Sequence, residues 1–105
     1  MAAVFKLNPA PTFRAVVDIP VPGGEPLGLE CEFRHQTRAA LKDWIGTFAG
    51  RDEADVLMDI VAGWHNADAG FSRDALDLLL QNYAQAGTAI LARYTAELTG
   101  ARLGN

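Results

Sequence analysis

The sequence contains one cysteine and two histidines, the residue types that could supply a nucleophile and its base. A reactive thiol needs a neighbouring cation or base that favours its thiolate. Cys31 stands between Leu29 and Phe33, in a stretch where apolar and polar residues alternate. This position predicts a buried core cysteine. His35 and His65 are expected at the ends of a strand and a helix, in surface or capping roles.

Two short segments have a composition that could bind a cation or a phosphate. Residues 66–70 place oxygen ligands at alternate positions, as at the start of a calcium loop, but Gly70 falls at position 5 and not at position 6. Gly23-Gly24 lacks the Lys-Ser/Thr pair and the following helix of a phosphate loop. One cysteine and two histidines also cannot form a structural zinc site unaided. We therefore expect no catalytic residue, no metal and no cofactor.

Length and charge place limits on the partners of this chain. Its 105 residues are 50% apolar and 21% charged, which predicts a single folded domain, residues 1–105. The net charge is −4, and most of the acidic excess lies in residues 52–77, which would repel a phosphate backbone. No stretch approaches about 18 uncharged apolar residues, and the N-terminus lacks the features of a signal peptide. We expect a cytoplasmic protein that binds neither nucleic acid nor membrane.

The N-terminal third has the pattern of a β-hairpin. Apolar side chains recur at every second position over residues 13–19 and 27–33, and Pro22-Gly23-Gly24 between them is a turn signal. Both apolar sets are odd-numbered, so the numbers of paired residues must add to an even total such as 46. The pattern predicts Phe13 beside Phe33 and Val17 beside Leu29, with a three- or five-residue loop or a bulge. Residues 4–7 are a candidate third strand.

From Thr37 onward the apolar period is that of helices. Thr37 is the expected N-cap of a first helix and Gly50 its end, and a second helix is expected from about Asp52. The apolar stripes that would face the core are Leu41, Trp44, Ile45 and Phe48 on the first helix, and Val56, Leu57, Ile60, Val61 and Trp64 on the second.

Two further helices are expected after a loop at residues 66–70. Ser72 is the expected N-cap of the third helix, with Phe71 and Leu76 at the spacing of a hydrophobic staple. The fourth helix begins near Gln85 and ends at Gly100. Their apolar stripes are Leu79, Leu80 and Tyr83 on the third helix, and Ile90, Leu91, Tyr94 and Leu98 on the fourth.

Together these elements predict the α+β class. A hairpin region, residues 1–35, would pack on a bundle of about four short helices, residues 36–100, followed by a tail, residues 101–105. So small a fold cannot bury nine aromatic residues completely, and partly exposed rings suit a protein-binding groove. The candidates for partner binding, with a core role as the alternative for each, are Trp44, Trp64, Phe71, Tyr83 and Tyr94.

Over nearly its whole length the chain resembles the small tail assembly chaperones of tailed phages and prophages. The resemblance lies in the order and spacing of short segments. These are Asn8-Pro9-Ala-Pro11-Thr12-Phe13, Val17-Asp-Ile19-Pro20-Val21-Pro22-Gly23-Gly24, Phe33-Arg-His35, Ala62-Gly63-Trp64, Phe71-Ser72, Leu79-Leu80-Gln-Asn82-Tyr83 and Tyr94-Thr-Ala-Glu97-Leu98-Thr-Gly100-Ala-Arg102.

The resemblance implies a non-enzymatic role. Members of the family are thought to bind the long, aggregation-prone tape-measure protein in the host cytoplasm until tail-tube subunits polymerise around it. The tape-measure protein is therefore the expected client, the tail-tube protein is a second candidate partner, and self-association stays open. Two alternatives remain at this point, which are a structural tail or connector protein of the virion and a small regulatory or ligand-binding subunit.

Overall fold

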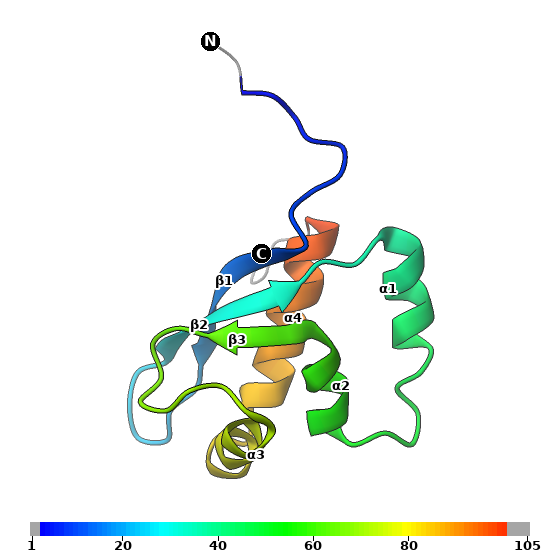
Figure 1. Cartoon of the computed structure of the whole chain (residues 1–105). Helices are drawn as coiled ribbons and strands as arrows, with labels where there is room; N and C mark the ends of the chain where they lie inside the picture. Colours follow the sequence, from blue (N-terminus) through cyan, green and yellow to red (C-terminus); the bar gives the residue numbers. More distant parts are fainter. Residues whose placement is uncertain (1–2, 101–105) are drawn as a thin grey trace.

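The computed structural model describes residues 3–100, which form a three-stranded antiparallel sheet and four helices. Along the chain these are β1 (Thr12–Ile19), β2 (Leu27–Arg34), α1 (Arg38–Ile45), α2 (Glu53–Ile60), β3 (Val61–Trp64), α3 (Arg73–Asn82) and α4 (Ala86–Thr99). The strand order is β1-β2-β3, and α4 runs behind the sheet against β1 (Figure 1). The predicted α+β class is confirmed, and the predicted tail lies outside the described residues.

The register of the hairpin is the predicted one, but its connection is longer. Phe13 pairs with Phe33, as predicted, and the ladder continues to Ile19 opposite Leu27. Seven residues, 20–26, therefore join the strands, and the expected three- or five-residue loop is wrong. Pro20 and Pro26 would form the next pair, and neither has an N–H to donate to the ladder.

The third strand is β3, so the expectation of a strand at residues 4–7 is wrong. That segment is exposed and lies outside any strand. β3 occupies the end of the expected second helix, and it pairs with β2 by placing Val61 opposite Phe33 and Trp64 opposite Cys31. The backbone of β2 would otherwise have an open second edge, and pairing satisfies its polar groups better than another helical turn would.

The junction between α2 and β3 has its own local causes. α2 ends at Ile60, and Val61, a β-branched residue, already has an extended conformation with ψ of 116°. The guanidinium of Arg34 donates to the carbonyl oxygens of Met58 at 3.2 Å and Val61 at 3.0 Å. These bonds satisfy carbonyl groups that the end of the helix leaves without intrahelical partners.

The predicted helix starts are confirmed, but α1 as well as α2 ends earlier than predicted. The Thr37 hydroxyl accepts from the amide of Ala40, and the Ser72 hydroxyl accepts in the same way from the third residue of α3. α1 ends at Ile45, before the expected Gly50. There the Thr47 side chain donates to the carbonyl of Trp44 at 2.6 Å, a local bond that competes with the helical ladder.

The core lies between the inner face of the sheet and the helices. Phe33 on β2 and Tyr94 on α4 are fully buried, with ring centroids 5.2 Å apart. Cys31 is also buried, as predicted, and burial raises the pKa of its thiol to about 12. Because the thiol stays protonated and covered, it is a core side chain and not a nucleophile.

Candidate partner-binding surfaces

A mostly apolar groove of about 550 Å³, here called the helical groove, opens between α2, α4 and the connection that follows α1. α4 forms its floor with residues one and two turns apart, Gly87, Leu91 and Thr95, so that small side chains flank a single leucine. The complete lining is Ile45, Phe48, Arg51, Glu53, Val56, Leu57, Gly87, Thr88, Leu91, Ala92 and Thr95.

Two opposite charges stand in the lining of the helical groove. The Glu53 carboxylate lies directly against Gly87 in the first turn of α4, where the helix dipole favours a negative charge. A Cβ at position 87 would collide with this carboxylate, so glycine permits the carboxylate to lie against the backbone of α4. Arg51 faces the groove from the connection, and its guanidinium is held by three acceptors around it.

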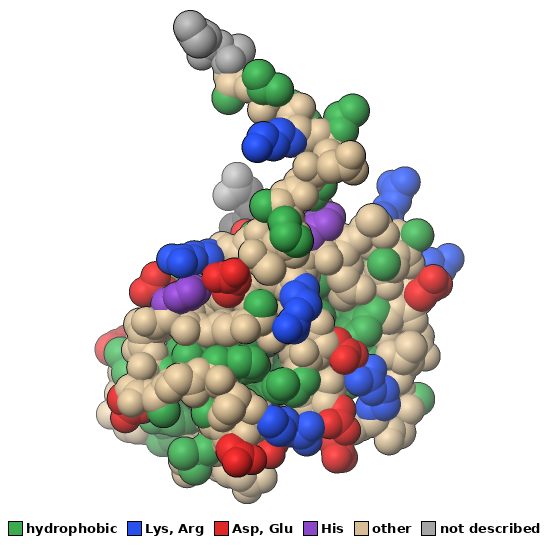
Figure 2. All heavy atoms as spheres, in the orientation of Figure 1, with side chains coloured by type: hydrophobic (Ala, Val, Ile, Leu, Met, Phe, Trp, Pro, Cys, Tyr) green, Lys and Arg blue, Asp and Glu red, His purple; other side chains and the backbone are tan. Residues whose placement is uncertain are grey.

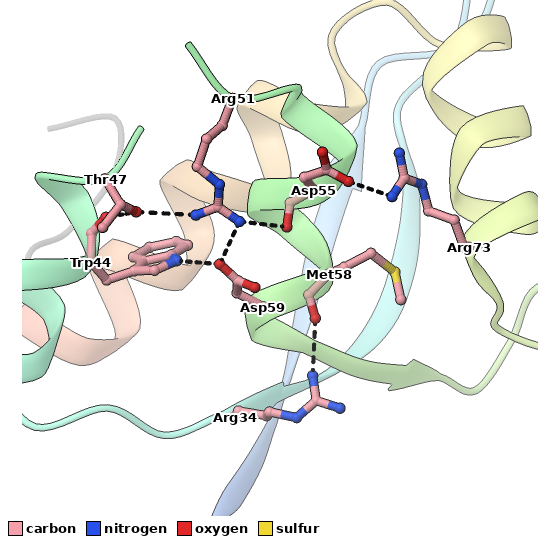
Figure 3. A network of polar contacts seen from close by, with 8 residues as sticks. All are labelled: Arg34, Trp44, Thr47, Arg51, Asp55, Met58, Asp59 and Arg73. Atoms are coloured by element: carbon pink, nitrogen blue, oxygen red, sulfur yellow. Dashed lines mark hydrogen bonds and ion pairs between the residues drawn. The ribbon is translucent and has the colours of Figure 1, made fainter. Parts of the chain in front are cut away.

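A network of polar contacts fixes the wall of the helical groove to α2 (Figure 3). The Asp59 carboxylate accepts from Trp44 Nε1 at 3.0 Å and from Arg51 at 2.9 Å, and Arg51 also donates to the Thr47 hydroxyl at 3.0 Å. Partial burial alone would raise the pKa of Asp59, but these two donors and the charge of Arg51 hold that pKa below its usual value. On the other side of α2, Asp55 forms an ion pair with Arg73 of α3.

A second apolar surface, here called the hairpin hollow, lies where the far end of the β1-β2 hairpin meets α3. It consists of two adjoining cavities of about 280 Å³ and 410 Å³, which share the lining residues Leu29, Ala67, Asp68, Leu79 and Tyr83. Leu27 and Leu78 form its rim and are 66% and 63% exposed. Figure 2 shows hydrophobic side chains gathered on the lower part of the molecule, around α3 and the loop before it.

The structure divides the five predicted partner-binding residues among three places. Trp64 and Tyr83 line the hairpin hollow, and the ring of Phe71 packs edge-on against Trp64 at 5.1 Å. Trp44 packs at 4.6 Å against Phe48, which lines the helical groove. Tyr94 is fully buried in the core and lines neither surface.

Sequence reasoning did not predict the floor of the helical groove. Leu91 was expected in the core stripe of α4, and it does pack against the core while also lining the groove. The small residues on the same side, Gly87, Thr88, Ala92 and Thr95, have the i, i+4 spacing of a helix face, which is the signal that could have identified it. Leu27 was expected on the apolar face of the hairpin but is 66% exposed at the rim of the hairpin hollow, and Leu78 was not singled out.

Within residues 3–100, no three His, Cys, Asp or Glu side chains gather closely enough to hold a metal ion. In that range, too, no helix has the length and apolar character needed to cross a bilayer.

Comparison with known families gives one match, which covers the whole chain. The model of a family described as phage tail assembly chaperone matches residues 1–105. Comparison with curated proteins and with solved structures finds no match.

Proposed function

This chain belongs to the phage tail assembly chaperone family, and we propose that it binds an apolar helical segment of the tape-measure protein in the helical groove. By covering such segments, it would keep the tape-measure protein soluble in the host cytoplasm during tail assembly. An assembly chaperone acts by reversible binding and is not an enzyme.

The observation that carries this proposal is the floor of the helical groove. Thr88, Ala92 and Thr95 are small, so the backbone of a client helix can approach α4 closely. Leu91, Ile45 and Phe48 then offer apolar contact to client side chains at i, i+3, i+4 and i+7. A groove with this lining suits the apolar stripe of an amphipathic helix.

The charges around the groove support the same function. Arg51 and Glu53 present opposite charges to the polar flank of a bound helix and would set its direction. The acidic excess of residues 52–77 would keep loaded complexes apart in solution. A long client offers many apolar helical stretches, so each contact can be weak while several copies of the chaperone together prevent aggregation. The tail-tube protein remains a second candidate partner.

The test is to co-express the chain with its tape-measure protein and to measure the soluble fraction of the client. Ile45 lines the groove and is 46% exposed, so Ile45→Lys should leave the fold intact and weaken capture at least about 10-fold. Val16 is 47% exposed on the outer face of the sheet, and Val16→Lys is the matched control that should capture client normally. A client that is equally insoluble with and without the chain contradicts the proposal.

The dependence of binding on salt provides an independent test. Burial of apolar surface is not weakened by screening, whereas exposed ion pairs are. A pull-down of the client should therefore change little as ionic strength rises. Binding that disappears at moderate salt would indicate capture by charge and would contradict an apolar groove.

A further inference from the structure

The N-terminal arm, residues 3–11, extends away from the rest of the protein and leaves its apolar side chains in water (Figure 1). Val4 and Phe5 are each 87% exposed and Leu7 is 89% exposed. Three large apolar side chains within four residues are unusual on the surface of a soluble protein and mark a contact surface. We propose that the arm of one copy docks in the hairpin hollow of a second copy of this chain.

The spacing of the arm residues matches the form of the hairpin hollow. In an extended chain Phe5 and Leu7 point to the same side, about 6.6 Å apart, while Val4 points to the other side. The hollow offers two adjoining cavities that share Leu29 and Leu79 between them. Extended segments are commonly recognised in this way, with alternate side chains in neighbouring pockets.

The charges of the two surfaces are complementary. Lys6 carries the one charged side chain of the arm, and it stands between the two residues that would enter the cavities. Asp68 lines both cavities of the hollow. With Phe5 and Leu7 seated, the flexible stem of Lys6 can bring its ammonium group to the Asp68 carboxylate at the rim.

The length of the arm favours a second copy over the hollow of the same chain. The arm joins β1 at Thr12, whereas one of the two cavities is lined by Ile19 and Leu27 at the opposite end of the hairpin. That end lies about 23 Å along the strand, and five extended residues carry Leu7 only about 17 Å from Thr12. Phe5 could span about 23 Å, but no length would remain for the chain to reverse direction. Both side chains therefore cannot fill the hollow of their own chain.

The first experiment measures the mass of the full-length chain by sedimentation velocity over a range of concentrations. The natural chain should associate as concentration rises, and Phe5→Asp should weaken this association at least about 10-fold. Val4→Asp is the matched control, because Val4 is equally exposed but points away from the hollow, and its association should stay within about threefold of the natural chain. A natural chain that is monomeric at every concentration, or a control as impaired as Phe5→Asp, would overturn the proposal.

The second experiment tests whether the two surfaces recognise each other. Leu78→Asp alters the rim of the hollow at an exposed position and should weaken self-association as strongly as Phe5→Asp does, so each variant is monomeric at a concentration where the natural chain associates. When Phe5→Asp and Leu78→Asp are mixed, the intact arm of one variant can enter the intact hollow of the other. Native mass spectrometry should then detect a 1:1 complex that neither variant forms alone, and circular dichroism should show that both variants are folded. A mixture that stays monomeric overturns the proposal.

These outcomes are independent of the proposed client groove. Ile45→Lys should reduce client capture without changing self-association, and Phe5→Asp should change self-association in the absence of client. If Phe5→Asp lowers only client capture, the arm contacts the client and the inference is wrong.

Discussion

Replacing Tyr94 with phenylalanine removes one hydroxyl group from the centre of the protein and leaves the ring in place. That hydroxyl donates to the carbonyl of Arg34 at 2.7 Å and accepts from the side-chain amide of Gln36 at 3.0 Å. Both bonds join α4 to the segment that leaves β2, across about 60 residues of sequence. The substitution therefore tests one long-range polar contact without creating a large cavity.

The expected loss of stability follows from what the hydroxyl leaves behind. The Arg34 carbonyl loses its donor beside a fully buried ring, while Gln36 is only half-buried and can turn to water. Because this hydrogen bond is only part-buried, its loss should cost about 1 kcal/mol. The packing of the ring against Phe33 and Trp44 is kept, so no further loss is expected from it. In a domain of this size the melting temperature should fall by about 4–8 °C.

Thermal and urea unfolding of Tyr94→Phe should be compared with Tyr83→Phe. Tyr83 is half-buried, and no side chain or backbone group within residues 3–100 forms a hydrogen bond with its hydroxyl, so its substitution should change stability by less than about 0.5 kcal/mol. The dependence of unfolding on urea should be the same for both variants, because neither changes the surface exposed on unfolding. If Tyr94→Phe melts within about 2 °C of Tyr83→Phe, the long-range contact contributes nothing and the reasoning is refuted.

Three further outcomes are expected. A thiol reagent should modify Cys31 slowly in the native protein and rapidly in urea, because burial raises the pKa of the thiol to about 12, and fast native labelling would contradict this. Phe71→Ala should cost about 2 kcal/mol by calorimetry, less than a fully buried phenylalanine, and an unchanged melting temperature would contradict its packing on Trp64. Hydrogen bonds from Thr12 and then from His65 lower the pKa of Glu32, so Glu32 contributes stability above its unfolded pKa of about 4.3 and loses it as pH falls through the folded value. Glu32→Gln should therefore be less stable at pH 7 with a deficit that shrinks below about pH 4, and a constant deficit down to pH 3 would contradict this.

The sequence was sufficient to predict the hairpin register but not the length of its connection. The register follows from the odd-numbered positions of the apolar residues on both strands, because Phe13 and Phe33 must share the buried face. The connection depends on Pro20 and Pro26, whose missing donors end the ladder early. β3 could not be predicted locally, since Val61 and Trp64 fit the helical stripe as well as a strand. These residues form a strand and not a further helical turn because they pair with the open edge of β2, which lies 27 or more residues earlier in the chain.

The candidate surfaces were predictable only in part, for a related reason. Aromatic residues at helical spacing identified Trp64 and Tyr83, which line the hairpin hollow. The same spacing included Tyr94, which is fully buried. Periodicity tells which face of a helix is apolar, but the angle at which helices pack decides whether that face is covered or left as a groove. Leu91 shows this directly, because its side chain packs against the core and also lines the helical groove.

The junction at Ile60 and Val61 joins the two apolar surfaces mechanically. α2 lines the helical groove with Val56, and β3 reaches the hairpin hollow with Trp64, with no loop residue between helix and strand. Because Arg34 of β2 is bonded to carbonyls on both sides of the junction, α2 and β3 are anchored together at one point of the sheet. A ligand in the groove that displaced α2 would have to strain these bonds. The two surfaces would be coupled only if that strain also moved β3, and by thermodynamic linkage the coupling would then be equal in both directions.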